Sequence, residues 1–283
     1  MLFLYINLFH VKSILFCFIT LFSLSVSSLK AFDNPPVGAR AQGMAGCGTA
    51  VNSDVWGLQN NQAAIAGIKS FQAAMFYESR FLVNGLGMKA FASALPIKQG
   101  VFGLSVTSFG YNLYSENKAG IAYARTFGPK ISAGVQINYQ NTRIAENYGS
   151  ASSATAELGI LAEPVKNLKI GFHLFNPTRS KLSGNLSERI PTVMRLGALY
   201  SFSEKVFLTA EAEKDIDYKA NFRGGIEYRP VPNFYLRAGA GSNPGLAAFG
   251  FGVVMKKLRL DVASSFHSVL GFSPAVSLQY GLE

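Results

Sequence analysis

Residues that commonly carry catalysis or bind metals are sparse in this 283-residue chain. Beyond the first thirty residues the histidines are His173 and His267, which lie on separate predicted strands without the spacing of metal ligands. The sequence contains no Gly-x-Ser-x-Gly elbow, no phosphate-binding loop and no paired-cysteine motif. It therefore predicts no enzyme, no metal site and no cofactor.

Charged residues of both signs recur on the polar side of the predicted strands in the last third of the chain. Residues opposite each other on paired strands share one face of the sheet, so parity predicts which charges meet. A symmetric turn near residue 218 sets Glu213 opposite Arg223, and the turn at residues 230–233 sets Glu227 opposite Arg237. The candidate lumen charges are Glu211, Glu213, Arg223, Glu227, Arg229, Arg237, Arg259 and Asp261. Their balance predicts a narrow, filled lumen, because an ion-selective pore shows a bias of one sign.

These charges are positioned by long alternating segments that begin near residue 70. Residues 131–140, for example, place apolar side chains on one face and small or polar side chains on the other, as a half-buried strand does. Turn pairs such as Asn84-Gly85 and Gly128-Pro129 separate about fourteen such runs. A soluble sandwich also alternates, but its strands are usually shorter, about 5–6 residues. The run length, and aromatic residues near run ends, predict an all-β fold: a closed antiparallel transmembrane β-barrel over residues 70–283.

The first thirty residues predict export of the chain. Residues 14–26 form an apolar core and a small residue follows Lys30, which is typical of a secretory signal peptide over residues 1–31. A single transmembrane anchor is the alternative, but it needs about 20 apolar residues. Removing residues 1–31 leaves 24 basic and 16 acidic residues and leaves Cys47 alone, without a disulfide partner. The bases are scattered singly, so we expect contacts with lipid headgroups at the rim and no nucleic-acid partner.

The segment between signal and barrel, residues 32–69, lacks the alternation of period two. Residues 54–68 could form a short helix with Leu58, Ile65 and Ile68 as its apolar members. Irregular backbone attached to a membrane barrel is sheltered only inside it, where it meets a polar lumen. Small residues permit close approach to the wall, so the sequence predicts an N-terminal plug.

The plug segment also forms a recognisable pattern. Its members are Gly38, Ala39, Arg40, Gly43, Gly46, Asp54, Asn61 and Ala63. Together with the last hairpin, residues 267–282, this pattern resembles the N-terminal signature of the PorV/PorQ family and of the wider FadL-like barrels. The chain departs from the family at Gln62, where a proline is expected, and at Ala64, where a glycine is expected.

The resemblance implies a fourteen-stranded barrel in the outer membrane of a Gram-negative bacterium. It further implies a non-enzymatic accessory role in type IX protein secretion or cell-surface attachment. The implied partners are outer-membrane lipid, a secretion translocon subunit and secreted cargo.

The wider FadL-like resemblance implies an alternative, a channel for uptake of hydrophobic small molecules. Inward-facing Phe175, Leu199, Phe207 and Tyr235 could line its path. Arg237 or Arg223 could then meet an acidic head group. The competing interpretation is that these aromatic residues fill space and these arginines pair across strands. A purely structural barrel is the third possibility.

Overall fold

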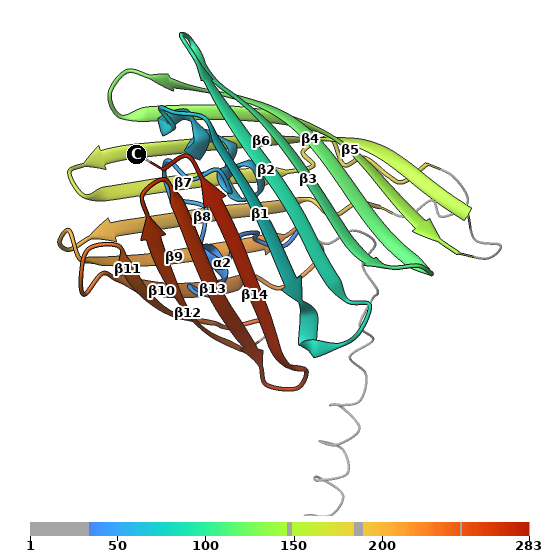
Figure 1. Cartoon of the computed structure of the whole chain (residues 1–283). Helices are drawn as coiled ribbons and strands as arrows, with labels where there is room; N and C mark the ends of the chain where they lie inside the picture. The colour runs from blue at the N-terminus through green and yellow to red at the C-terminus, as the bar shows by residue number, and fades with distance from the viewer. Residues whose placement is uncertain (1–33, 146–148, 184–188, 244, 283) are drawn as a thin grey trace, which may run out of the picture. The chain divides into compact units, whose positions relative to one another are not determined.

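The computed structural model describes residues 34–145, 149–183, 189–243 and 245–282. The predicted signal peptide, residues 1–31, lies outside the described residues. Within them the chain forms a closed antiparallel barrel of fourteen strands, in which each strand pairs with its sequence neighbours and β1 closes onto β14 (Figure 1). The strands are β1 (Gln72–Ser79), β2 (Gly87–Ile97), β3 (Gly100–Tyr111), β4 (Tyr114–Phe127), β5 (Ile131–Ile144), β6 (Gly149–Val165), β7 (Leu168–Phe175), β8 (Val193–Ser201), β9 (Val206–Asp215), β10 (Asn221–Tyr228), β11 (Phe234–Gly241), β12 (Leu246–Met255), β13 (Leu258–His267) and β14 (Gly271–Tyr280). The predicted closed antiparallel barrel of about fourteen strands is thus confirmed.

The barrel is inside-out compared with a soluble protein. On β5 the outward side chains of Val135 and Ile137 are exposed, whereas the inward side chains of Gln136 and Asn138 are 1% exposed. The same alternation of exposed apolar and buried polar positions runs along the other long strands. An apolar outer band of this extent is what a lipid-embedded barrel presents to the acyl chains.

The two ends of the barrel differ in their connections. At the end where β1 begins and β14 ends, here called the terminus rim, every turn between strands has two to five residues. The opposite end, the loop rim, carries the longest connection, residues 176–192, together with the 3₁₀ helix η2 (Arg80–Leu82). Residues Leu182 and Ile190 of the long connection fold inward and bury Phe175 with Ala151 and Val193.

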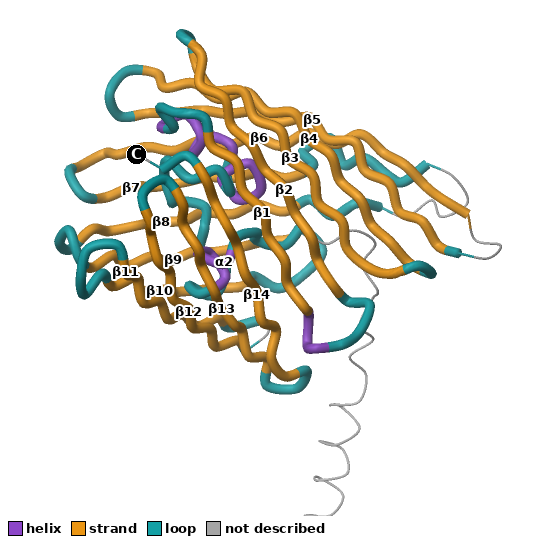
Figure 2. Tube along the Cα trace, in the orientation of Figure 1, coloured by secondary structure: helices purple, strands orange, loops and turns teal. Residues whose placement is uncertain are grey.

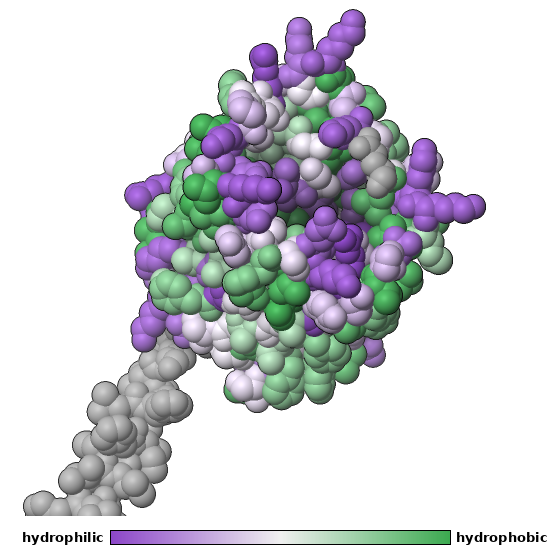
Figure 3. Space-filling view, turned by 90° about the vertical axis from the view of Figure 1, so that its left-hand side faces the viewer, coloured by the Kyte–Doolittle hydropathy of each residue, from purple (hydrophilic) through white to green (hydrophobic). Residues whose placement is uncertain are grey.

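The terminus rim is strongly basic. Its exposed bases, here called the basic collar, are Lys69, Lys98, Arg125, Lys130, Lys166, Lys205, Lys256 and Lys257. Among the described residues of this rim, the exposed acid is Glu204. Figure 3 looks onto this end and shows hydrophilic side chains projecting around the rim, with hydrophobic residues on the wall between them.

The plug lies inside the ring of strands. It contains α2 (Ala39–Gln42), α3 (Gly57–Asn60) and the 3₁₀ helix η1 (Gln62–Gly67), which Figure 2 shows as short helical pieces within the barrel. The helix expected over residues 54–68 is divided because Asn61 is extended, with φ −172°. Its side chain turns away to accept a hydrogen bond from the backbone of Ala63 and so caps η1. The expected apolar members Leu58, Ile65 and Ile68 are buried.

No helix among the described residues is both long enough and apolar enough to cross a membrane.

Candidate functional site: the plug, the lumen charges and a vestibule

Inward-facing glycines let the plug rest directly on the wall. A Cβ atom added at Gly134 would lie 2.6 Å from the carbonyl carbon of Gln62, and one at Gly171 would lie 2.1 Å from the carbonyl oxygen of Thr49. Both distances are below any real Cβ contact, so these positions accept only glycine unless the plug shifts. The further wall glycines against the plug are Gly103, Gly159, Gly197, Gly225, Gly239 and Gly250. The plug is therefore fitted to the wall by backbone contact on both sides of the lumen.

Adjacent glycines of β10 test this fit. At Gly225 an added Cβ would meet Met44 of the plug at 2.6 Å, whereas at the outward Gly224 the nearest atom would be 3.8 Å away. We expect Gly225→Ala to lower the free energy of unfolding by about 1–3 kcal/mol through overpacking, or to displace the plug. Gly224→Ala is the matched control and should leave stability unchanged. Urea unfolding in detergent and limited proteolysis of the plug measure both outcomes, and equal effects of the two variants would contradict the backbone fit.

One cluster of charges joins the plug to β10, β11 and β13. Arg40 of the plug donates to both carboxylate oxygens of Glu227, at 2.6 and 3.0 Å. Arg237 Nε lies 2.6 Å from the same carboxylate, and Arg237 Nη1 lies 2.9 Å from Asp261. Arg259 pairs with Asp261 at 2.9 Å and reaches Glu227 at 3.6 Å. Five of the charges are thus held together, and the plug supplies one of the arginines.

A second cluster joins the plug to β8, β9 and β10. Glu211 accepts hydrogen bonds from the backbone N–H groups of Gly48 and Thr49, at 3.1 and 3.0 Å. Arg223 lies 4.0 Å from Glu211 and makes a closer ion pair with Glu213, which Arg195 also contacts at 2.7 Å. A carboxylate that satisfies two plug amides positions this part of the plug.

The register corrects one predicted pairing. Glu227 lies opposite Arg237 as parity required, but Glu213 lies opposite Asn221, and Arg223 lies opposite Glu211. The pairing of β9 with β10 is centred on residue 217 instead of residue 218, so each residue faces a partner two positions away from the predicted one. The Arg223 to Glu213 ion pair forms diagonally across the strands.

Arg229 does not join the other predicted lumen charges. It lies just beyond β10, in the turn at the terminus rim, where its backbone N–H donates to the carbonyl of Lys205 at 2.7 Å. The strand ends before Arg229, so parity along the strand no longer fixes the direction of its side chain.

The predicted plug motif occupies tight positions throughout. Gly38 has φ +101° and lies against Trp56, where an added Cβ would be 2.7 Å from the indole ring. Gly43 contacts Gly250 of the wall, and Gly46 has φ +88°. Ala39 and Ala63 are fully buried. Each of these positions excludes a larger side chain or favours glycine for its backbone conformation.

The polar members of the motif hold the plug together. Asp54 accepts a hydrogen bond from the backbone of Trp56 at 3.0 Å and lies 3.5 Å from Arg40. Asn61 donates to the carbonyl oxygens of Thr49 in the plug, at 2.7 Å, and of Ile160 in the wall, at 3.0 Å. Asn61 therefore ties two plug turns to β6.

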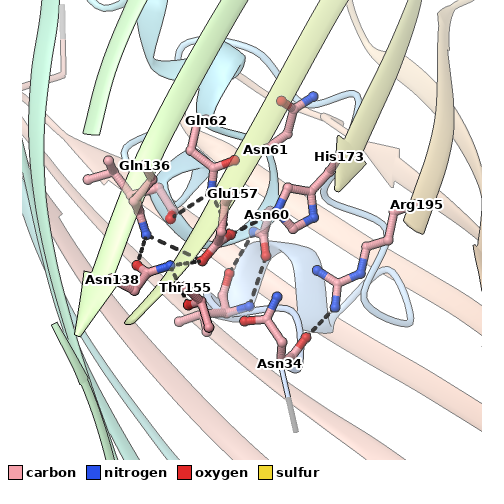
Figure 4. Close-up of polar contacts among 12 residues, drawn as sticks. Asn34, Asn60, Asn61, Gln62, Gln136, Asn138, Thr155, Glu157, His173 and Arg195 are labelled. Carbon is pink, nitrogen blue, oxygen red and sulfur yellow. Dashed lines mark hydrogen bonds and ion pairs between the residues drawn. The ribbon is translucent and has the colours of Figure 1, made fainter. Parts of the chain in front are cut away.

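A third cluster, centred on Glu157, was missed by sequence reasoning. Figure 4 shows the Glu157 carboxylate among side chains from the plug and from β5 and β7. It accepts hydrogen bonds from Gln62 at 2.7 Å and Asn138 at 2.9 Å, lies 2.8 Å from His173 Nε2, and pairs with Lys118 at 3.2 Å. Glu157 and His173 are fully buried. The signal that could have found it is the run of inward polar residues on β5, next to an acid of the same face in the middle of β6.

Residue Asn34 links the start of the plug to this cluster and to β8. Its side-chain oxygen accepts a hydrogen bond from Lys118 Nζ at 2.8 Å, and its backbone oxygen accepts one from Arg195. Because Arg195 also contacts Glu213, the second and third clusters are connected through the plug.

Removing one buried charge of the third cluster should destabilise the barrel. Glu157→Leu leaves Lys118 without a carboxylate inside the wall, and we expect a loss of about 3–5 kcal/mol in the free energy of unfolding. The double variant Lys118→Met with Glu157→Leu should lose less than the sum of the single variants, by about 1–3 kcal/mol. Urea unfolding of the four proteins in one detergent measures this coupling. Strictly additive losses would show that the pair is not coupled.

The aromatic and aliphatic residues considered as a lumen path are packed instead. Leu199 and Phe207 lie against Met44, Cys47 and neighbouring plug residues. Tyr235 lies beneath the guanidinium groups of Arg237 and Arg259, with the guanidinium carbon of Arg259 5.2 Å from the centre of the tyrosine ring. In this arrangement they fill space around the plug.

Cys47 reports on the state of the plug. It is fully buried in the plug core, and burial, followed by the negative charge of Glu211, raises the pKa of its thiol to about 12. The thiol therefore stays protonated near neutral pH, where the thiolate is the reactive form.

We expect the folded protein to resist thiol-directed reagents. At pH 8 a thiol with a pKa of about 12 is about one part in ten thousand thiolate, so N-ethylmaleimide should react about a thousandfold more slowly than with an exposed cysteine. Labelling followed by mass spectrometry measures the rate, with urea-unfolded protein as the control. Rapid labelling of the folded protein would show that the plug core opens readily.

A vestibule lies above the plug at the loop rim. It has a volume of about 260 Å³, and its floor is formed by plug residues 34–36 and by Gln42, Ala45 and Gly46. Phe81 of η2 stands at its edge with φ +56°, a strained conformation for a residue with a side chain, and packs edge-on against His267. Its other lining residues are Glu78, Arg80, Glu213, Asn221, Arg223, Gly241, Leu246, Ser265 and Ser273.

Comparison with known proteins places the fold. No protein-family model matches the sequence, and no curated protein sequence matches it significantly. The structure is similar to the Ralstonia pickettii toluene transporter TbuX, with a TM-score of 0.68, 12% identity, and coverage of 91% of this chain and 100% of that chain. It is also similar to the CymD monoaromatic hydrocarbon channel, with a TM-score of 0.67, 13% identity and coverage of 89% and 99%. A Pseudomonas aeruginosa FadL homologue gives a TM-score of 0.65, 13% identity and coverage of 88% and 99%. At these identities the likeness shows the fold alone, a closed FadL-like barrel.

Proposed function

We propose that this protein is an outer-membrane channel for a small hydrophobic molecule. The observation that carries the proposal is the vestibule at the loop rim, whose floor is the plug itself. The similarity to transporters of toluene and of monoaromatic hydrocarbons supports the same function. Short turns of such barrels face the periplasm, so the loop rim and its vestibule face the outside.

The vestibule matches a ligand of about one aromatic ring. A cavity of about 150 Å³ is enough to bind benzene, and the vestibule holds about 260 Å³. Leu246, Phe81 and Ala45 offer apolar contact, while the arginines beside them are engaged with acids of the same site. A neutral apolar molecule fits this lining better than an ion does.

The plug is the barrier that such a ligand must pass. Ala45 is part of the floor of the vestibule, and Met44 beside it lies against Gly225 and Gly239 of the wall. On the outer face of the wall at these same glycines lies an apolar groove over β8 to β11, lined by small residues such as Ala210, Gly224 and Ala238. Glycines face the lumen at 225 and 239 and the outer groove at 224, so movement of the Met44 region would bring the ligand against wall backbone that few side chains cover.

The secretion-accessory role implied by the PorV/PorQ resemblance is the second candidate. The observation that favours it is the extensive locking of the plug, since three charge clusters hold it to the wall. A permanently sealed barrel would act by docking partners and would need no passage. Purification from native membranes separates the two, because a translocon subunit or cargo in fixed proportion supports docking.

Filling the vestibule tests the channel. Leu246→Trp places a larger side chain in the vestibule, and we expect uptake of toluene into proteoliposomes to fall at least tenfold, because the indole ring narrows the way in. Ala247→Trp, the outward neighbour on β12, is the matched control and should leave uptake unchanged. Uptake that is equally high in both variants would reject the vestibule as the way in.

The labelling rate of Cys47 gives an independent readout. If the plug moves during transport, saturating toluene should raise the rate in the unaltered protein and not in Leu246→Trp. An unchanged rate together with normal uptake would mean that the ligand passes around a fixed plug.

A further inference from the structure

The basic collar at the terminus rim includes a concave site that the channel function does not use. A pocket of about 510 Å³ lies where the plug leaves the barrel, beside the β2–β3 turn and the end of β4. It is lined by three collar bases, Lys69, Lys98 and Arg125, and no acidic residue occurs among the described residues that line it. Three cations without an acid among them attract an anion.

The same pocket has an apolar part. Ile68, Ile97 and Val101 line it next to the bases. A free anion makes no favourable contact with these apolar side chains, whereas a phospholipid carries a charged phosphate next to apolar acyl chains. The lining therefore fits an amphipathic anion better than a bare one.

The position of the collar on the barrel indicates that the anion belongs to a lipid. Arg125 stands over Phe127 of the outward face, with its guanidinium carbon 5.9 Å from the ring centre. Lys256 and Lys257 lie between the outward, exposed side chains of Met255 and Leu258. Aromatic and apolar residues of this kind mark the membrane interface, so the bases beside them lie at the level of lipid headgroups.

We propose that the terminus rim binds anionic phospholipid through this collar, with the phosphate held in the pocket of Lys69, Lys98 and Arg125. Each base near a membrane surface contributes about 1 kcal/mol to the attraction of anionic lipid. The site lies at the end of the barrel opposite the vestibule and is independent of the transported ligand.

The test compares two variants that each remove three positive charges. The collar variant carries Lys69→Gln, Lys98→Gln and Arg125→Gln, and the control carries Arg143→Gln, Arg179→Gln and Lys181→Gln at the loop rim. We expect binding of short-chain phosphatidylglycerol to the purified protein, measured by native mass spectrometry, to weaken about a hundredfold in the collar variant. Binding of phosphatidylglycerol to the control variant should be unchanged. Binding of phosphatidylcholine should be the same for all the proteins. Equal losses in both variants would overturn the proposal.

Two further arms exclude other sources of the anion. Binding to the unaltered protein should weaken as salt is raised from about 0.01 to 0.15 M, because salt screens exposed charges. Inorganic phosphate at the same concentration as the lipid should not compete; full competition would identify a free-anion site and overturn the lipid assignment. A third outcome would also overturn the lipid assignment. In it, an acidic protein co-purifies with the unaltered protein but not with the collar variant, while the collar variant binds phosphatidylglycerol as well as the unaltered protein does.

Discussion

The backbone of the plug lies in direct contact with the barrel wall, and the placement of the other lumen side chains depends on this contact. Where the plug touches the wall, as at Gly134 and Gly171, a side chain has no room. The plug backbone is then cut off from water, so its polar groups need partners from the wall. Glu211 accepts hydrogen bonds from the backbone amides of Gly48 and Thr49, while the wall carbonyl of Ile160 accepts one from the side chain of Asn61. The charged side chains of the lumen lie where the plug and the wall glycines leave space for them.

The lumen charges position the plug more than they stabilise the barrel. Taking an ion pair out of water costs about as much as its attraction returns, so such pairs give little net stability. Breaking one pair is nevertheless expensive, since the remaining charge stays buried without its partner. Arg40 with Glu227 on β10, and Gln62 with Glu157 on β6, therefore hold the plug in one place at two separate points of the wall. The apolar outer band, in contact with lipid, is what keeps the barrel in the membrane.

Local sequence patterns predicted the barrel, but they did not predict contacts between segments that lie far apart in the sequence. Alternation of period two is a property of each strand, so the strand number and the inward face of residues such as Glu227 could be read from the sequence. Register depends on turn geometry, which is why Arg223 faces Glu211. The role of Glu157 depends on Gln62, 95 residues away, and on Lys118 two strands away. Gly224 and Gly225 look alike in the sequence, and only the plug distinguishes them.

In the proposed channel, selection of a ligand by the vestibule would rest on charges that already have partners. Arg80 pairs with Glu78 at 3.5 Å and lies over the ring of Phe109, and Arg223 pairs with Glu213. His267 Nδ1 accepts hydrogen bonds from the backbone N–H groups of Val269 and Leu270. An ion entering the site would have to displace one of these partners and lose its own hydration, whereas an apolar molecule displaces only water. A lumen that is rich in charge can therefore still admit neutral molecules in preference to ions.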